Sequence, residues 1–457
     1  MAMAENQVPQ QSGVRAVRTL ADLGFAPFAA GVIARRRRVQ GLLERYDADR
    51  RQVERMRALR QEFGRGPVEL VVPGRRVVIV TDPEDVGRVL AQAPSPFHPA
   101  NREKRAALRQ FQPHAVLVSE GGLREQRRAV NEAALDTAAP LHRLAWPFAD
   151  LVAAEARPLL TDALRRGRFD AEQFTVAWWR LVRRLVLGER ARDDHAVTDE
   201  LQRLRSAANW SFLAPVHRRR RERFLERLYS YTASAEPDSL AGALAATPAS
   251  GAVDPVGQIP HWLFAFDAAG IASTRALALL ATHPEHLERA RIDSADPSTP
   301  GLRPYLRACV LESVRLWPTT PAILRDTITE TQWREGGDRF TIAPGAALVI
   351  FTPAFHRDPD LLPFADEFVP QIWLDNRASQ YPQLVPFSAG PAECPGRNLV
   401  LFVTSTVLAH LLHEAEFQLR SRPRPAPNTP LPKTFNNYGI EFAITARPLA
   451  EQHGRSR

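Results

Sequence analysis

Residues 83–284 have the apolar spacing of helices nearly throughout, and β-like segments lie on both sides of this stretch. Before it, residues 68–72 and 76–80 flank Pro73-Gly74, which is a hairpin signal. The later strand-like segments are 322–329, 346–351 and 439–446. An early hairpin that pairs with late strands encloses the helices in one unit. The sequence therefore predicts a mainly α fold with a small β-region (α+β).

The predicted helices of this body and of the region after it are 122–135, 147–166, 171–187, 197–210, 216–234, 260–282, 302–316 and 396–412. The stretch 235–257 is rich in Pro, Gly, Ala and Ser, and we interpret it as a linker between two helices. Residues 353–395 form a long irregular stretch rich in Pro, Phe and Trp. Long irregular stretches inside compact domains usually carry function.

Composition narrows the class of protein. With 44% hydrophobic residues, 24% charged residues and a net charge of +9, the chain is neither disordered, collagen-like nor a disulfide scaffold. Cys309 and Cys394 lie in unrelated contexts, which favours a reducing compartment and a cytoplasmic location. The apolar run 23–34 is shorter than the roughly 20 residues of a membrane span. Because Arg35–Arg38 follow it, weak peripheral membrane contact is the alternative to an ordinary helix with a solvated face.

The local sequence around Cys394 is the most informative about function. It lies among small, turn-forming residues in the segment 386–397, and Gly396 opens the next helix. Backbone N–H groups at a turn and a helix N-terminus stabilise a thiolate. On these residues alone, Cys394 is a nucleophile, a metal ligand or a loop cysteine without a role.

Phe387, Gly390, Cys394 and Gly396, at this spacing before an apolar helix, resemble the haem-binding loop of the cytochrome P450 family. Three further segments match that family in the expected order: Ala269-Gly270-Ile-Ala-Ser273-Thr274 in the central helix, Glu312-Ser-Val-Arg315 followed by Arg325, and Phe368-Val-Pro-Gln-Ile-Trp373. The resemblance spans roughly residues 65–446. It implies residues 1–64 as an extension with helices packed on the domain, and residues 65–457 as a single P450-like haem domain.

The resemblance also implies a cofactor and its ligands. Heme b would be bound through a thiolate from Cys394, with Phe387, Gly390, Gly396 and Gly270 around it. Arg325 and Arg127 would meet its propionates. The catalytic residues implied on the oxygen side are Ser273 and Thr274. The candidate substrate residues are Phe264, Asp267, Ile271 and Ile323, with Asp267 available for an amine or a hydroxyl.

Three positions depart from the family pattern around the cofactor. Ala392 and Leu123 stand where the family usually has propionate donors, and His98 is the candidate replacement. Ile372 replaces an Arg that normally completes a triad with the Glu-x-x-Arg pair. Glu312 and Arg315 would then pair only with each other, or recruit Arg377 or a backbone carbonyl.

The fourth departure concerns activity. Ala272 stands where the central helix normally presents an acid, so the usual proton relay is incomplete; such general acid help contributes ~10²–10⁴ in rate. We expect a monooxygenase that inserts one oxygen atom from O2 into a small, largely apolar substrate, a secondary metabolite. The alternatives are a peroxide-using enzyme and a protein that does not hydroxylate, with a role in isomerisation, coupling or as an auxiliary protein.

The resemblance also implies partners. Electrons would come from a ferredoxin- or flavodoxin-type donor with its reductase, since the family pattern here includes no fused reductase. The excess of positive charge suits an acidic carrier. The basic runs lack aromatic interleaving, so no nucleic acid is expected, and neither is a membrane span.

Overall fold

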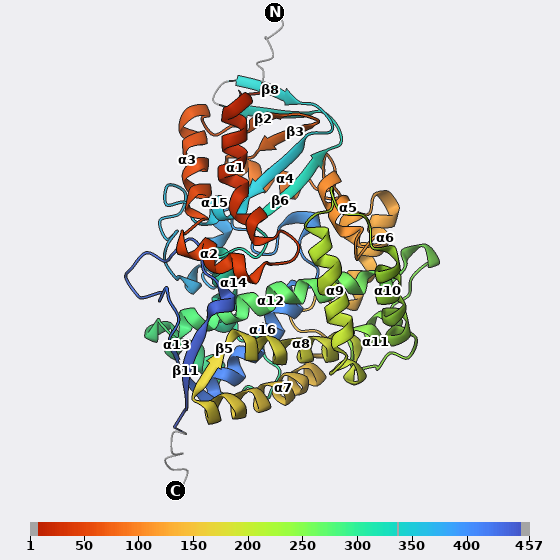
Figure 1. Ribbon diagram of the computed structural model, residues 1–457, viewed down its shortest axis with the longest axis vertical. Coiled ribbons are helices and arrows are strands. Elements are labelled where there is room, and N and C mark those ends of the chain that lie inside the picture. The colour runs from red at the N-terminus through yellow and green to blue at the C-terminus, as the bar shows by residue number, and fades with distance from the viewer. Residues whose placement is uncertain (1–7, 336–337, 449–457) are drawn as a thin grey trace, which may run out of the picture.

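The computed structural model of the protein describes residues 8–335 and 338–448. Figure 1 shows two regions: a β-rich part beside the N-terminal helices, and a larger helical part crossed by α12. The structure confirms the predicted class, a mainly helical fold with small sheets.

The main sheet joins strands from both ends of the chain. Its order is β1 (Gln10–Gln11), β2 (Val68–Val72), β3 (Arg75–Ile79), β9 (Ala347–Phe351), β6 (Ala322–Thr327) and β4 (Phe97–His98). The β2–β3 hairpin turns at Pro73-Gly74, and β3 runs parallel to β9 with Val78 opposite Leu348. The predicted pairing of an early hairpin with late strands is confirmed.

Two smaller sheets complete the β-structure of the described residues. One contains β10 (Ala415–Leu419), β11 (Glu441–Ala446) and β5 (Arg168–Asp170). The other is the hairpin of β7 (Thr331–Glu335) and β8 (Asp338–Ile342).

The helices are α1 (Gly13–Ala30), α2 (Arg37–Arg45), α3 (Arg50–Phe63), α4 (Pro83–Ala91), α5 (Arg102–Leu108), α6 (Gly121–Ala134), α7 (Ala145–Arg166), α8 (Ala171–Leu187), α9 (His195–Ala208), α10 (Arg218–Ala233), α11 (Leu240–Ala245), α12 (Ile259–Leu280), α13 (Pro284–Asp293), α14 (Pro304–Leu316), α15 (Thr352–His356) and α16 (Arg397–Glu414). The stretch predicted as a linker, 235–257, contains α11, so that interpretation was wrong in part. Ser239 caps α11 by accepting a hydrogen bond from the Gly242 amide, and Leu240 and Leu244 bury it in the core.

Helix α12 forms the centre of the helical part. It starts with a proline in its first turn, and apolar residues surround it on all sides, which is typical of a helix buried in a core. It packs against α8, α14 and α16. The run Gly251–Leu280 is long and apolar enough to cross a membrane by length and composition, but 78% of its apolar window is buried inside the protein.

The N-terminal segment is attached to the helical part. The predicted extension of residues 1–64, described from residue 8, packs through α1 on β2 and α3. Between α1 and α2 the chain crosses to the end of α9, where the Asn209 side chain accepts hydrogen bonds from the amides of Ile33 (2.9 Å) and Ala34 (3.2 Å). Asn209 also donates to the Ala34 carbonyl at 2.8 Å. This clamp holds the start of the arginine run against the functional site.

Candidate active site

A cavity of about 380 Å³ separates α12 from the loop that carries Cys394. Cys394 and Phe387 line one side, and Ala268, Ala269 and Ala272 of α12 line the other. The predicted substrate residues Phe264, Asp267, Ile271 and Ile323 all line this cavity. The wall is mainly apolar, with charged groups confined to a few places.

The loop of Cys394 is held by its own backbone. The Cys394 amide donates to the Phe387 carbonyl (3.0 Å), and α16 begins three residues later. Gly390 has φ +65°, and a Cβ there would lie 2.3 Å from the Leu90 carbonyl oxygen, so only glycine fits. Burial raises the pKa of the Cys394 thiol, while a hydrogen bond from the Gly396 backbone acts in the opposite direction. A thiolate here therefore needs a cationic partner.

Two buried arginines, Arg325 and Arg124, and the half-buried Lys104 lie beside this loop, and none of the three forms an ion pair among the described residues. Arg325 is 3% exposed and donates to the Leu324 carbonyl at 2.9 Å, but its Nε has no hydrogen-bond partner among the described residues. Burial, followed by repulsion from Arg124, lowers the pKa of Arg325 to about 10. The Nε of Arg124 is likewise buried without a described partner. Lys104 lines the cavity and donates to the carbonyls of Leu324 and Pro99, and burial lowers its pKa well below the usual value.

His98 lies near the same cations. It is buried on β4, and its Nδ1 accepts a hydrogen bond from the Ala100 amide (3.2 Å). Burial lowers the pKa of His98, and Arg124 adds to that effect. His98 is thus a neutral neighbour of the cation group, while Ala392 lines the cavity without a polar side chain.

Of the cofactor residues implied by the resemblance, Phe387 and Cys394 line this cavity. Gly390 and Gly396 lie in the Cys394 loop without lining the cavity, and Arg325 donates to Ser388 Oγ of that loop at 3.4 Å.

Arg127 and Gly270 have other partners. Arg127 donates through Nε to the Val253 carbonyl (2.9 Å) and through Nη1 to Ser119 Oγ (2.8 Å), away from the cavity. A Cβ on Gly270 would lie 2.7 Å from Nε1 of Trp178. Gly270 allows α8 and α12 to approach, and it lines a second cavity of about 350 Å³.

The two hydroxyls of α12 are engaged within the helix. Ser273 Oγ donates to the Ala269 carbonyl at 2.9 Å, and Thr274 Oγ1 lies 3.1 Å from the Ile271 carbonyl. Neither residue is among those that line the Cys394 cavity, and Thr274 lines the second cavity instead. Ala272 faces the Cys394 cavity, so a side chain there would reach the site.

The Glu312–Arg315 pair forms the most completely bonded ion pair near the site. Both side chains are 0% exposed and lie 2.6 Å apart. Glu312 also accepts hydrogen bonds from the Val369 amide (2.9 Å) and from Trp373 Nε1 (3.0 Å). Arg315 donates to three backbone carbonyls, of His356, Ala365 and Glu367. Of the alternatives predicted for this pair, the structure shows the recruitment of backbone carbonyls by Arg315. Arg377 pairs with Asp375 instead of with Glu312.

Comparisons with known proteins give a matching family and a solved structure with the same fold. The sequence model described as Cytochrome P450 matches residues 266–441, which include α12, the Glu312–Arg315 pair and Cys394. A crystal structure of a cytochrome P450, CYP102L1, superposes with a TM-score of 0.73 over 97% of this chain and 100% of that one, at 18% identity.

Residues 266–441 match the cytochrome P450 family, and the whole chain has the fold of a solved P450. The chain is 34% identical over 173 residues to cyclooctat-9-en-7-ol 5-monooxygenase of Streptomyces melanosporofaciens, covering 35% of each chain. It is 28% identical over 186 residues to drimenol monooxygenase of Persicaria hydropiper, covering 36% of each chain. The matched segment thus spans about a third of the length of these relatives.

The matching family binds haem through a cysteine thiolate, and the residues of this chain fit that group. The half-buried Cys394 thiol lines an apolar cavity, and none of the nearby cations Arg325, Arg124 and Lys104 forms an ion pair among the described residues. Two of these three cations, Arg124 and Lys104, were missed by sequence reasoning. Arg124 lies one turn before Arg128 in a helix crowded with arginines, so helical spacing alone gave no signal to prefer it.

Proposed function

We propose that this protein is a haem-thiolate monooxygenase that inserts one oxygen atom from O2 into a small, largely apolar organic substrate. The observation that carries the proposal is Cys394 in the wall of an apolar cavity opposite the alanines of α12. When bound, haem supplies the redox chemistry that activates dioxygen.

The chain's own residues have separate roles in this proposal. Cys394 would bind the haem iron, and Arg325, Arg124 and Lys104 would hold the propionates. Phe264 and Ile323 line the substrate space and exclude water from it. Electrons come from a separate ferredoxin- or flavodoxin-type donor, and the net charge of +9 supports docking of an acidic carrier. A cytoplasmic location and a secondary-metabolite substrate remain part of the proposal.

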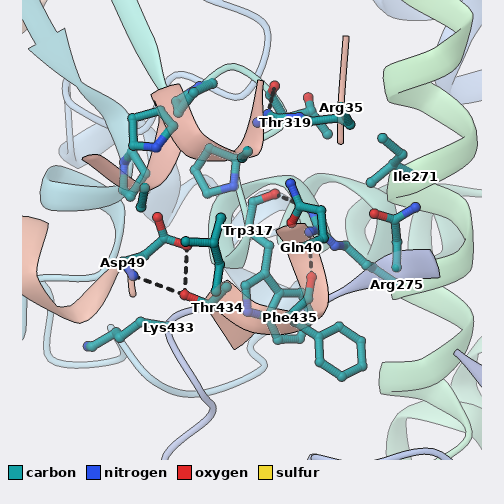
Figure 2. Close-up of a pocket in the computed structure, with 18 residues that line it drawn as sticks. Arg35, Gln40, Asp49, Ile271, Arg275, Trp317, Thr319, Lys433, Thr434 and Phe435 are labelled. Carbon is teal, nitrogen blue, oxygen red and sulfur yellow. Dashed lines mark hydrogen bonds between the residues drawn. The ribbon is translucent and has the colours of Figure 1, made fainter. Parts of the chain in front are cut away.

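One observation favours a second candidate, a peroxide-using enzyme. The α12 residues that line the Cys394 cavity include no hydroxyl, and the hydroxyls of Ser273 and Thr274 bond to helix carbonyls. Hydrogen peroxide as the oxidant delivers its oxygen already protonated, so the enzyme needs no proton relay. Arg275 does not take part, because it donates to the Trp317 and Phe435 carbonyls on the other side of α12 (Figure 2).

Isotope labelling separates the two. The purified protein is supplied with a ferredoxin, its reductase, NADPH and ¹⁸O2, with adamantane-1-carboxylic acid and 1-adamantanol as probes. The monooxygenase proposal predicts one labelled oxygen atom in each product molecule. Product formed only with hydrogen peroxide would establish the second candidate, and no oxygenated product under either condition would contradict both.

A further inference from the structure

Arg35 stands where three cavities meet. It lines the Cys394 cavity, the second cavity beside Trp178 and a third, small one of about 50 Å³. Figure 2 shows its side chain crossing above the small cavity toward Thr319. The Asn209 clamp on the two residues before it fixes its backbone. Arg35 is therefore part of the substrate space, although it belongs to the N-terminal segment.

The Arg35 guanidinium lacks a full set of partners. Its one side-chain hydrogen bond among the described residues runs from Nη2 to the Thr319 carbonyl (2.7 Å), and no described carboxylate forms an ion pair with it. Burial lowers the pKa of Arg35. Arg35 is half-buried, and the charges of Asp49 and Asp267 partly offset the effect of burial on its pKa. A partly desolvated guanidinium that has no directly paired carboxylate favours an anion in the adjacent space.

The nearest acids are already engaged. Asp267, the one carboxylate of α12 that lines the cavity, lies 2.6 Å from Nη2 of Arg205, whose side chain is 3% exposed. Asp49 accepts a hydrogen bond from Thr434 Oγ1 (2.8 Å), and burial raises its pKa (Figure 2). Within the Cys394 cavity, Arg35 and Arg205 therefore face one carboxylate, Asp267, which is paired with Arg205, while Asp49 lines the small cavity instead.

We propose that the cavity takes an apolar molecule with one carboxylate, and that Arg35 binds this carboxylate. The inference rests on the proposed function, because it assigns the substrate class of the same cavity. A guanidinium presents its N–H groups in a planar fork that matches a carboxylate. Val32, Ile33, Leu117 and Phe264 provide apolar wall for the rest of the molecule.

This assignment changes the role of Asp267. It was expected to bind an amine or a hydroxyl of the substrate, but it pairs with Arg205, and Arg35 has no direct ion pair among the described residues. Asp267 then orients Arg205, which also lies over the Phe264 ring at 4.8 Å. Asp267 and Phe264, two of the four predicted substrate residues, thus shape the pocket for an anion.

Calorimetric titration with matched ligands tests the inference on the purified protein. One set is decanoate, 1-decanol and decylamine; the other is adamantane-1-carboxylate, 1-adamantanol and 1-adamantanamine. We expect the carboxylate to bind most tightly in at least one set. Arg35→Gln should weaken carboxylate binding about tenfold or more, because a charged hydrogen bond is lost. It should change alcohol binding less than about threefold, the range of a neutral site.

Arg38→Gln is the matched control, since Arg38 is exposed and lies outside the three cavities; it should keep wild-type affinities. Arg35→Lys should recover part of the carboxylate affinity. The inference is overturned if the alcohol or the amine binds best in both sets, if Arg35→Gln keeps the carboxylate preference, or if no carboxylate binds.

The failure of this inference and of the proposed function can be told apart. The carbon monoxide spectrum of the same preparation reports the haem thiolate without any ligand. A thiolate spectrum without carboxylate preference defeats the inference alone. Carboxylate binding that depends on Arg35, in a protein without that spectrum, defeats the proposed function alone.

Discussion

The Cys394 side and the α12 side of the cavity are built in different ways. On the Cys394 side, backbone hydrogen bonds, a glycine in a left-handed conformation and a buried ion pair hold the loop in place. On the α12 side, alanines face the cavity and the hydroxyls bond to the helix itself. A residue's position can therefore be inferred from a family motif most safely where backbone geometry requires that residue. The inference is least safe where only the direction of a side chain decides whether it faces the cavity.

The largest effect on stability should come from removing the buried ion pair on the Cys394 side of the cavity. Glu312→Gln leaves Arg315 buried with its charge unpaired, and loss of one partner of a buried pair costs about 3–5 kcal/mol. Urea unfolding should therefore show a free energy of unfolding lower by that amount. Asp375→Asn, which removes the half-exposed partner of Arg377, is the control and should cost less than about 1 kcal/mol. Equal losses in the two variants would contradict the distinction.

Adding an acid to the α12 side of the cavity should have the next largest effect, on product formation. Ala272→Glu places a carboxylate on the cavity face of α12, where general acid help is typically worth ~10²–10⁴ in rate. We expect the ratio of donor-driven to peroxide-driven product to rise at least about tenfold. Ala272→Gln, of the same size but without a transferable proton, should not raise it. A similar rise in both variants would show that shape, and not the acid, matters.

Much of the fold could be predicted from the sequence, because strong local signals agree with the tertiary structure. Residues 171–187 were predicted as a helix, and α8 has these bounds because Asp170 and Gln173 form a capping box at its start. Helix α11 was missed, since its short apolar stretch lies among Pro and Ser residues. Its burial depends on contacts with α6, α8 and α10 that sequence spacing does not show.

The site could be predicted in part. The position of Cys394 and the four substrate candidates follow from loop and helix patterns, and all five line the cavity. The cations could not be predicted, because the direction of an arginine side chain depends on distant elements. Val253 and Ser119 draw Arg127 away from the cavity, and Asn209 brings the segment of Arg35 to it.

The smallest effect should be on the rate of haem release, which distinguishes Arg325 from Arg127. Arg325→Gln removes a buried charge whose Nε has no described partner, and we expect haem to transfer to apomyoglobin about tenfold faster, as for loss of one charged hydrogen bond. Arg127→Gln should leave the transfer rate near the wild-type value, because Arg127 bonds to Val253 and Ser119. Faster transfer from the Arg127 variant than from the Arg325 variant would reverse this assignment.

We propose that Cys394 binds haem iron as a thiolate, and the two cysteines of the chain, Cys394 and Cys309, provide a matched test. The absorption spectrum of the dithionite-reduced protein under carbon monoxide is recorded for the wild type, Cys394→Ser and Cys309→Ser. Cys309 is 0% exposed and lies in the core on α14. We predict a red-shifted thiolate-type Soret band in the wild type and in Cys309→Ser, and its loss in Cys394→Ser. A band that survives in Cys394→Ser, or a wild type that binds no haem, would contradict the account.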